Sequence, residues 1–131
     1  MTPELTALAL AILLQAAQLA IFAIPANFEL GARYTTSPRD EPPDGSLSTP
    51  TARMQRAFQN HFEALILFTA AVTLVTVSDQ STWFTALCAF AYLAARIVYV
   101  PAYVLGWAPG RSIIWAAGFL ATILMTLAAL L

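Results

Sequence analysis

Four long apolar stretches constrain the fold more than any other feature of this sequence. They cover residues 5–24, 57–77, 83–105 and 112–131 approximately. Each has the roughly 20 residues that a helix needs to cross a bilayer. Only 10% of the 131 residues are charged, whereas a soluble domain has about 25%. We therefore predict an all-α integral membrane protein, folded as a single four-helix bundle over residues 1–131.

The connections between these stretches differ in length. Residues 26–51 form a polar segment rich in Pro, Ser, Asp and Gly, which favours a loop. We expect Pro25 to end the first helix, because proline lacks the N–H that the helix needs. The first stretch has no cationic leader and is too long for a signal peptide, so we expect it to be retained. Residues 78–81 are so few that the second and third helices must form a hairpin.

The arginines predict the orientation of the chain. The sequence has six arginines and no lysine. Five of them flank the spans on one side of the membrane: Arg33, Arg39, Arg53, Arg56 and Arg111. Because positive residues favour the cytoplasmic side, the long loop is expected in the cytoplasm and both termini outside it. The absence of a basic run argues against nucleic acid as a partner.

Arg96 is the one arginine inside a span. An ionisable side chain there is unfavourable unless it meets a partner or a polar cavity. Glu63 is the natural candidate, because it lies at a similar depth in the second span. The two residues could join two helices as a purely structural pair, or they could line a site.

Polar residues recur on one face of each neighbouring helix. The second span carries Arg53, Arg56, Asn60 and Glu63, and the third carries Arg96, Tyr99 and Tyr103. Both sets follow the spacing of one helical face. Arg111 and Ser112 open the fourth helix, where the dipole is positive. These residues converge at one end of the bundle, as either interhelical contacts or a binding site.

The chemistry of this set favours a small zwitterionic ligand with more than one carboxylate. Guanidinium groups bind carboxylates through paired hydrogen bonds, and a carboxylate such as Glu63 suits an amine. Arg111 and Ser112 at a helix N-terminus would also stabilise a thiolate. We expect no metal ion.

The segment from Arg53 to Glu63 resembles the signature of the MAPEG family, the membrane-associated proteins in eicosanoid and glutathione metabolism. It matches R-x-x-R-A-x-x-N-x-x-E. Arg96, Tyr99, Tyr103, Gly106 and Arg111-Ser112 are similar to the family's third and fourth helices. The resemblance covers essentially the whole chain, and "YVPAY" and "PRDEPP" look more like the bacterial branch, which implies a bacterial inner membrane.

The resemblance implies a homotrimer that binds glutathione as cosubstrate between subunits. Arg56, Asn60 and Glu63 match the positions that hold the peptide, with Glu63 on its amine. Arg53, Arg96, Tyr99 and Tyr103 are further expected glutathione contacts. Arg111, followed by Ser112, resembles the position that stabilises the thiolate, so these two are the expected catalytic residues.

The function implied is a glutathione transferase or peroxidase that conjugates or reduces lipophilic electrophiles or hydroperoxides. Gln59, Tyr99 and Trp115 depart from the prostaglandin-synthase-like members, which argues against that activity. His61, beside the motif, is interpreted as structural. A non-catalytic protein that presents lipid on the same scaffold is the alternative. A small multidrug transporter fits less well, because the first helix carries Gln15 and Gln18 where such transporters carry a carboxylate.

Overall fold

The computed structural model describes residues 1–43 and 45–131, and these residues form helices and loops without strands. The long helices are α1 (Pro3–Leu30), α3 (Thr49–Val77), α4 (Trp83–Val104) and α5 (Gly110–Leu130). All four are long and apolar enough to cross a membrane. The prediction of an all-α membrane bundle with four spans is confirmed.

Local sequence explains where the helices begin and end. The side chains of Thr2, Ser48 and Thr82 accept hydrogen bonds from the first turns of α1, α3 and α4, as N-cap residues do. Gly31 ends α1 with a φ of 85°, a backbone conformation that glycine adopts easily. These caps place the helix ends outside the most apolar part of each stretch.

The expectation that Pro25 ends the first helix is wrong, because α1 continues through it to Leu30. A proline removes one backbone hydrogen bond, but helices that cross membranes tolerate that loss more readily than soluble ones. The Asn27 side chain also donates to the carbonyl of Ala23, 2.8 Å away, beside Pro25.

The segment expected as a loop is therefore partly helical. Its first residues belong to α1, the short helix α2 (Ala32–Thr35) follows, and α3 begins at Thr49. Asp44 of this segment lies outside the described residues. At its far end, Glu29 of α1 accepts hydrogen bonds from the backbone N–H of Ser48 and the hydroxyl of Thr51, which ties the end of α1 to the beginning of α3.

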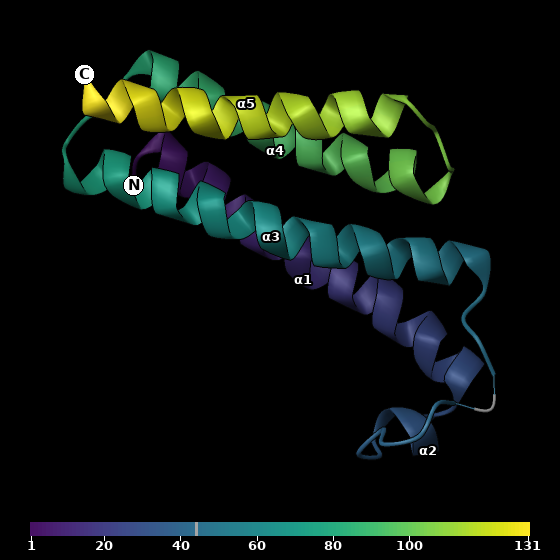
Figure 1. Ribbon diagram of the computed structural model, residues 1–131. Coiled ribbons are helices and arrows are strands. Elements are labelled where there is room, and N and C mark those ends of the chain that lie inside the picture. Colours follow the sequence, from purple (N-terminus) through teal and green to yellow (C-terminus); the bar gives the residue numbers. More distant parts are fainter. Residues whose placement is uncertain (44) are drawn as a thin grey trace.

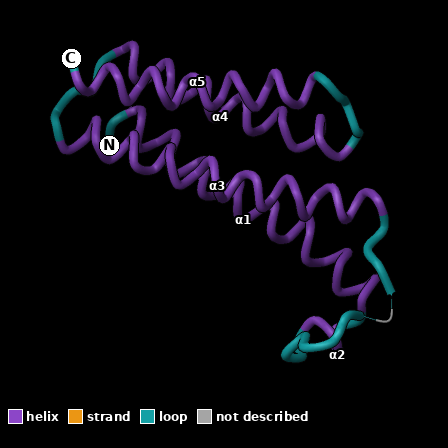
Figure 2. The backbone as a smooth tube through the Cα atoms, in the orientation of Figure 1, coloured by secondary structure: helices purple, strands orange, loops and turns teal. Residues whose placement is uncertain are grey.

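Two helix pairs make up the bundle. Figure 1 shows α1 beside α3 and α4 beside α5, with the two pairs close together near the N- and C-termini and farther apart at the other end. The tube in Figure 2 follows the same long helices, with short connections from α3 to α4 and from α4 to α5 and a longer one from α1 to α3. We call the two ends the terminal end and the arginine end, the latter being where α1 and α4 stop and α3 and α5 begin.

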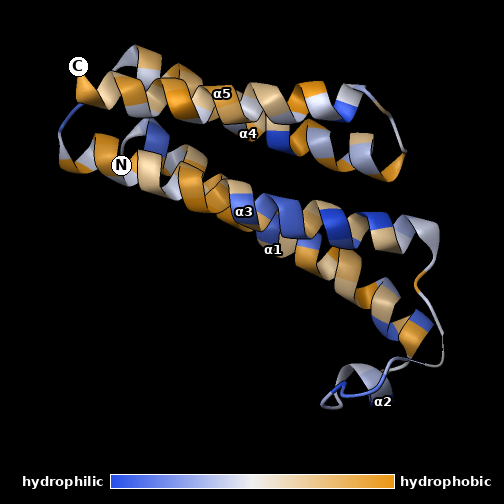
Figure 3. Cartoon of the chain, viewed as in Figure 1, coloured by the Kyte–Doolittle hydropathy of each residue, from blue (hydrophilic) through white to orange (hydrophobic). Residues whose placement is uncertain are grey.

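The two ends differ in what they bury. The hydrophobic core lies toward the terminal end and includes Ala7, Phe68, Val72, Tyr92 and Met125. Figure 3 shows hydrophilic residues gathered in the first half of α3, toward the arginine end. The fold therefore holds the bundle together at one end and brings polar side chains together at the other.

Candidate functional site

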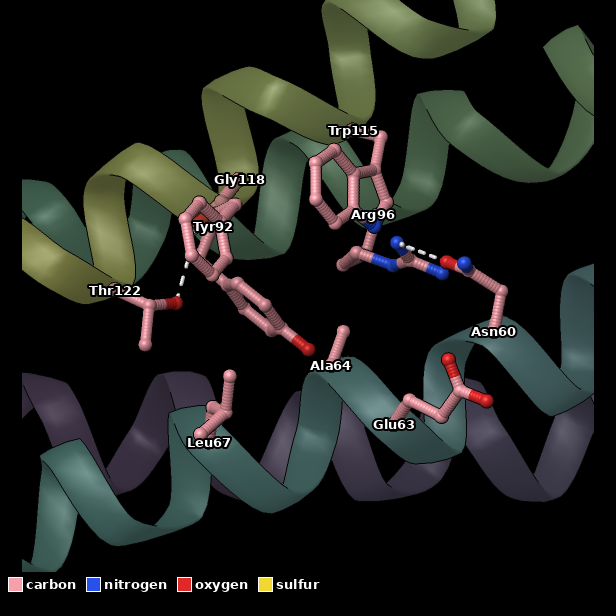
Figure 4. A pocket seen from close by; sticks show the side chains of 10 residues that line it. Asn60, Glu63, Ala64, Leu67, Tyr92, Arg96, Trp115, Gly118 and Thr122 are labelled. Atoms are coloured by element: carbon pink, nitrogen blue, oxygen red, sulfur yellow. Dashed lines mark hydrogen bonds between the residues drawn. The ribbon is translucent and has the colours of Figure 1, made fainter.

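The central contact of the site joins α3 to α4 through Asn60 and Arg96. Nη1 of Arg96 donates to Oδ1 of Asn60, 3.0 Å away, and Figure 4 shows this bond between the two helices. The predicted partner, Glu63, does not take that place. Glu63 is exposed on α3, whereas Asn60, almost one turn earlier, faces the guanidinium. Arg96 is thus buried against a neutral amide.

Two tyrosine rings of α4 contact three of the arginines. The Arg96 guanidinium carbon lies 4.2 Å from the centre of the Tyr99 ring. Arg111 lies over the Tyr103 ring at 4.7 Å, while Nε of Arg56 donates to the Tyr103 hydroxyl at 3.0 Å. Such cation–π contacts stabilise a guanidinium near a ring face. The tyrosines therefore hold three positive groups close together at one end of the bundle.

Arg53 has a different position from the other predicted residues. Its Nη1 donates to the carbonyl of Val104 at 3.1 Å, at the end of α4. The guanidinium also packs on Gly106, where a Cβ would lie only 3.0 Å from Nη1. Arg53 lines neither of the cavities described next, and the same is true of Arg56 and Tyr103. In this structure it joins the start of α3 to the end of α4.

One cavity, which we call the arginine cavity, lies at the start of α5. It has a volume of about 210 Å³. Its lining residues are Asn60, Tyr99, Arg111, Ser112 and Trp115. Four of the predicted site residues are thus brought together. The backbone N–H groups of Arg111 and Ser112 donate to Trp107 and Pro109, so the polar groups offered to a ligand are mainly side chains.

A second cavity, the inner cavity, continues toward the terminal end between α3 and α5. Its volume is about 180 Å³, and it shares Asn60 and Trp115 with the arginine cavity. Its polar lining residues are Asn60, Glu63, Tyr92, Arg96 and Thr122, and its other lining residues are Ala64, Leu67, Trp115, Gly118 and Phe119. Both cavities contain charged side chains, Arg111 in the arginine cavity and Glu63 and Arg96 in the inner cavity.

His61 belongs to a separate polar cluster between α1 and α3. It is fully buried, and its Nδ1 lies 2.7 Å from Oε1 of Gln15 and 2.9 Å from Nε2 of Gln18. Gln15 also donates to the carbonyl of Phe58 at 3.1 Å. None of the three residues lines either cavity, which agrees with the structural role predicted for His61.

Comparison with models of known protein families shows the family of the chain. The model of the MAPEG family matches residues 5–131. The chain belongs to the MAPEG family. No curated protein and no solved structure gives a significant match.

Membership in the MAPEG family gives a context for the geometry. The family includes glutathione-dependent transferases and peroxidases and also members without catalysis. Its match extends over all four long helices. The MAPEG motif residues Asn60 and Glu63 line the inner cavity, and Asn60 also lines the arginine cavity.

Sequence reasoning missed Tyr92, Leu67 and Phe119 as residues of the inner cavity. Tyr92 continues the α4 stripe, since it lies four residues before Arg96 and so on the same helical face. That spacing could have identified it. Leu67 and Phe119 have no comparable signal, because each is one of many apolar residues in its helix.

Proposed function

We propose that this MAPEG protein is a membrane-bound glutathione transferase or peroxidase that acts on lipophilic electrophiles or hydroperoxides. The observation that carries the proposal is the convergence of Asn60, Tyr99, Arg111 and Ser112 on one cavity. Three helices supply these groups, so the arrangement depends on the tertiary fold and is not a chance cluster on one helix.

The charges of the site suit glutathione. Its amine would bind Glu63, and its carboxylates would bind the guanidinium groups of Arg56 and Arg111, which both contact Tyr103. Asn60, oriented by Arg96, would bond to the peptide. Bidentate pairs between arginine and carboxylate are among the stronger polar contacts in proteins.

Arg111 and Ser112 would hold the glutathione sulfur as a thiolate. A positive charge and a hydroxyl donor lower a thiol pKa from its usual value of about 8.5. In conjugation, the thiolate forms a bond to an electrophilic carbon and a leaving group departs with its electron pair. In peroxide reduction, the sulfur attacks the terminal oxygen, the alkoxide takes a proton, and a second glutathione converts the sulfenic acid to a disulfide and water.

We further propose that the subunits form a homotrimer with the arginine end in the cytoplasm. Glu63 and Arg56 are exposed in this chain, and Glu63 lies inside a helix long enough to span the membrane. A carboxylate facing lipid would be unfavourable. A neighbouring subunit that covers this face would shield it and bury the glutathione between subunits.

Calorimetry of glutathione binding to the purified protein tests the proposal. We expect saturable binding that Glu63→Gln and Arg56→Ala both weaken strongly. Asp79→Asn, in the hairpin at the terminal end, is the matched control and should leave binding unchanged. Absence of binding to a folded protein would contradict the proposal and favour the lipid-presenting alternative.

A further inference from the structure

A third cavity, which we call the loop cavity, lies apart from the site described above. It has a volume of about 400 Å³ and lies between the last turns of α1, the loop that contains α2, and Gln55 of α3. Among residues 1–43 and 45–131, none lines both this cavity and one of the other two. Figure 1 shows α2 beside the end of α1 and away from α4 and α5. The proposed glutathione contacts therefore do not account for this cavity.

Hydrogen bonds hold the loop against α1 on both sides of the cavity. The hydroxyl of Thr35 donates to Oδ1 of Asn27 on α1. Nε and Nη2 of Arg39 both donate to the carbonyl of Thr35, at 3.1 and 2.6 Å. Near the beginning of α3, the backbone N–H of Ser48 donates to the Glu29 carboxylate. Specific contacts therefore define the walls of the cavity.

The position of the cavity along α1 places it at the boundary of a bilayer. α1 has 28 residues, which correspond to about 42 Å at 1.5 Å per residue. The hydrocarbon core of a bilayer is only about 30 Å thick, or roughly 20 helical residues. If the core begins at the start of α1, it ends near Phe22, and the last turns of α1 lie among the lipid headgroups. The loop cavity then extends from the apolar layer into the headgroup layer.

The walls of the cavity change in polarity along the same direction. The side chains that line it from α1 are mostly apolar, namely Phe22, Ala23, Ala26 and Leu30. Tyr34 and Arg39 line it from the loop, and Arg39 alone carries a charge among its described lining residues. The Thr35 carbonyl takes two of the five N–H donors of that guanidinium. Three donors remain, and the strongest acceptor for them is an anionic oxygen.

We propose that the loop cavity binds one membrane phospholipid as a structural ligand. The phosphate accepts hydrogen bonds from Arg39 and Tyr34, and one acyl chain lies against Phe22, Ala26 and Leu30. A volume of about 400 Å³ is within the usual range of small-molecule sites, so the cavity holds the headgroup and the first part of that chain. The bound lipid joins the loop to the membrane span. This site is independent of the thiol chemistry proposed above.

Native mass spectrometry of the delipidated protein in detergent tests the proposal with three probes. Dioleoyl phosphatidylglycerol has both the phosphate and the chains, dioleoylglycerol has the chains alone, and glycerol 3-phosphate has the phosphate alone. We expect one tight, saturable phospholipid site per chain. Dioleoylglycerol should bind at least about tenfold more weakly, because it lacks the charged hydrogen-bond acceptor. Glycerol 3-phosphate should not compete, because it lacks the apolar contact.

Arg39→Gln tests the headgroup contact, and Arg33→Gln is its matched control. Both arginines are exposed in the same loop, but Arg33 does not line the cavity. We expect Arg39→Gln to weaken phospholipid binding about tenfold and Arg33→Gln to change it by less than about twofold. A general attraction of lipid to positive charge would instead give equal effects.

Ala23→Leu tests the apolar wall without changing any charge, and it is informative even if Arg39→Gln disturbs the loop. Its larger side chain should occupy part of the cavity and weaken phospholipid binding severalfold. Ala20→Leu, almost one turn earlier on α1 and outside the cavity, should leave binding unchanged.

Three results would overturn the proposal: equal affinity for dioleoylglycerol and the phospholipid, competition by glycerol 3-phosphate, or equal effects within either matched pair of variants. The last result would indicate lipid bound nonspecifically around the spans. All of these measurements are made without glutathione, so they do not depend on whether the protein binds it.

Discussion

Glu4 and Arg96 are both buried charged side chains, but the fold pairs them very differently. Glu4 is fully buried near the terminal end. Its carboxylate accepts hydrogen bonds from Thr85 and from Ser81, whose Oγ lies 2.8 Å from Oε2. These partners lie where α4 begins, and the positive end of the helix dipole also favours a carboxylate there. Arg96 has one amide partner, and two of its nitrogens have no partner among residues 1–43 and 45–131.

This difference separates a structural charge from one that is available to a ligand. A buried polar group without a partner costs about 1–3 kcal/mol, so the fold keeps such a group only where something else offsets the loss. The Glu4 cluster is satisfied within the chain and lines neither cavity. Arg96, by contrast, lines the inner cavity. We infer that the terminal end supplies stability and the arginine end supplies binding.

The largest effect should come from Arg111→Ala. Without the guanidinium, the pKa of bound glutathione should rise toward the free thiol value of about 8.5, so less thiolate is present at neutral pH. We expect kcat/KM to fall by about 10²–10³-fold, by analogy with the loss of one donor to a developing anion. The residual activity should increase with pH above neutrality, and ultraviolet absorbance of the thiolate would follow the same shift.

Unchanged thiolate formation in Arg111→Ala would remove this residue from the proposed chemistry. Arg111→Lys is the matched variant. It keeps the charge but not the planar group over Tyr103, so it should retain part of the thiolate signal.

A smaller effect is expected from Glu63→Gln. The substitution keeps the size of the side chain and removes the negative charge proposed to bind the glutathione amine. A hydrogen bond to a charged group contributes about 1.5–3 kcal/mol, which corresponds to a weakening of glutathione binding by roughly 10–100-fold. Calorimetry would measure it, and the melting temperature without glutathione should change little, because the substitution keeps the size and shape of the side chain. Equal loss of stability and affinity would show that Glu63 is structural.

Glu4→Gln should produce the opposite pattern, with a loss of stability and no loss of binding. The neutral amide cannot replace the carboxylate that accepts from Ser81 and Thr85. We expect unfolding to become easier by about 1–3 kcal/mol. Glutathione affinity of the folded protein should stay the same. Denaturant titration in detergent, compared with Glu63→Gln, would measure the contrast, and an affinity loss in Glu4→Gln would contradict the division between the two ends.

The smallest effect is expected from Arg53→Met. Arg53 lies outside both cavities and donates to the carbonyl of Val104. Its loss should lower stability by about 0.5–1.5 kcal/mol, the net contribution of a typical hydrogen bond, and should change glutathione affinity by less than about threefold. Calorimetry and thermal melting would check both values. A large affinity loss would return Arg53 to the glutathione site, as the sequence motif predicts.

Much of the architecture could be predicted because membrane spans depend on local composition. Four apolar stretches of sufficient length give four helices in a bilayer, where each helix satisfies its own backbone hydrogen bonds. The exact ends could not be predicted in the same way. Pro25 was expected to stop α1, but the helix continues to Leu30, and the capping residue Ser48 starts α3 well before its apolar stretch.

The site residues were predicted from helical spacing. Spacing shows which residues share a face of one helix, but it does not show what that face contacts. The sequence determined that Asn60 and Glu63 share a face of α3 and that Arg96, Tyr99 and Tyr103 share a face of α4. Only the tertiary structure decided that Asn60 pairs with Arg96, that Arg53 binds the end of α4, and that Tyr92 lines the inner cavity. The physical reason is that the rotation and separation of packed helices set these pairings, and both depend on side chains distant in sequence.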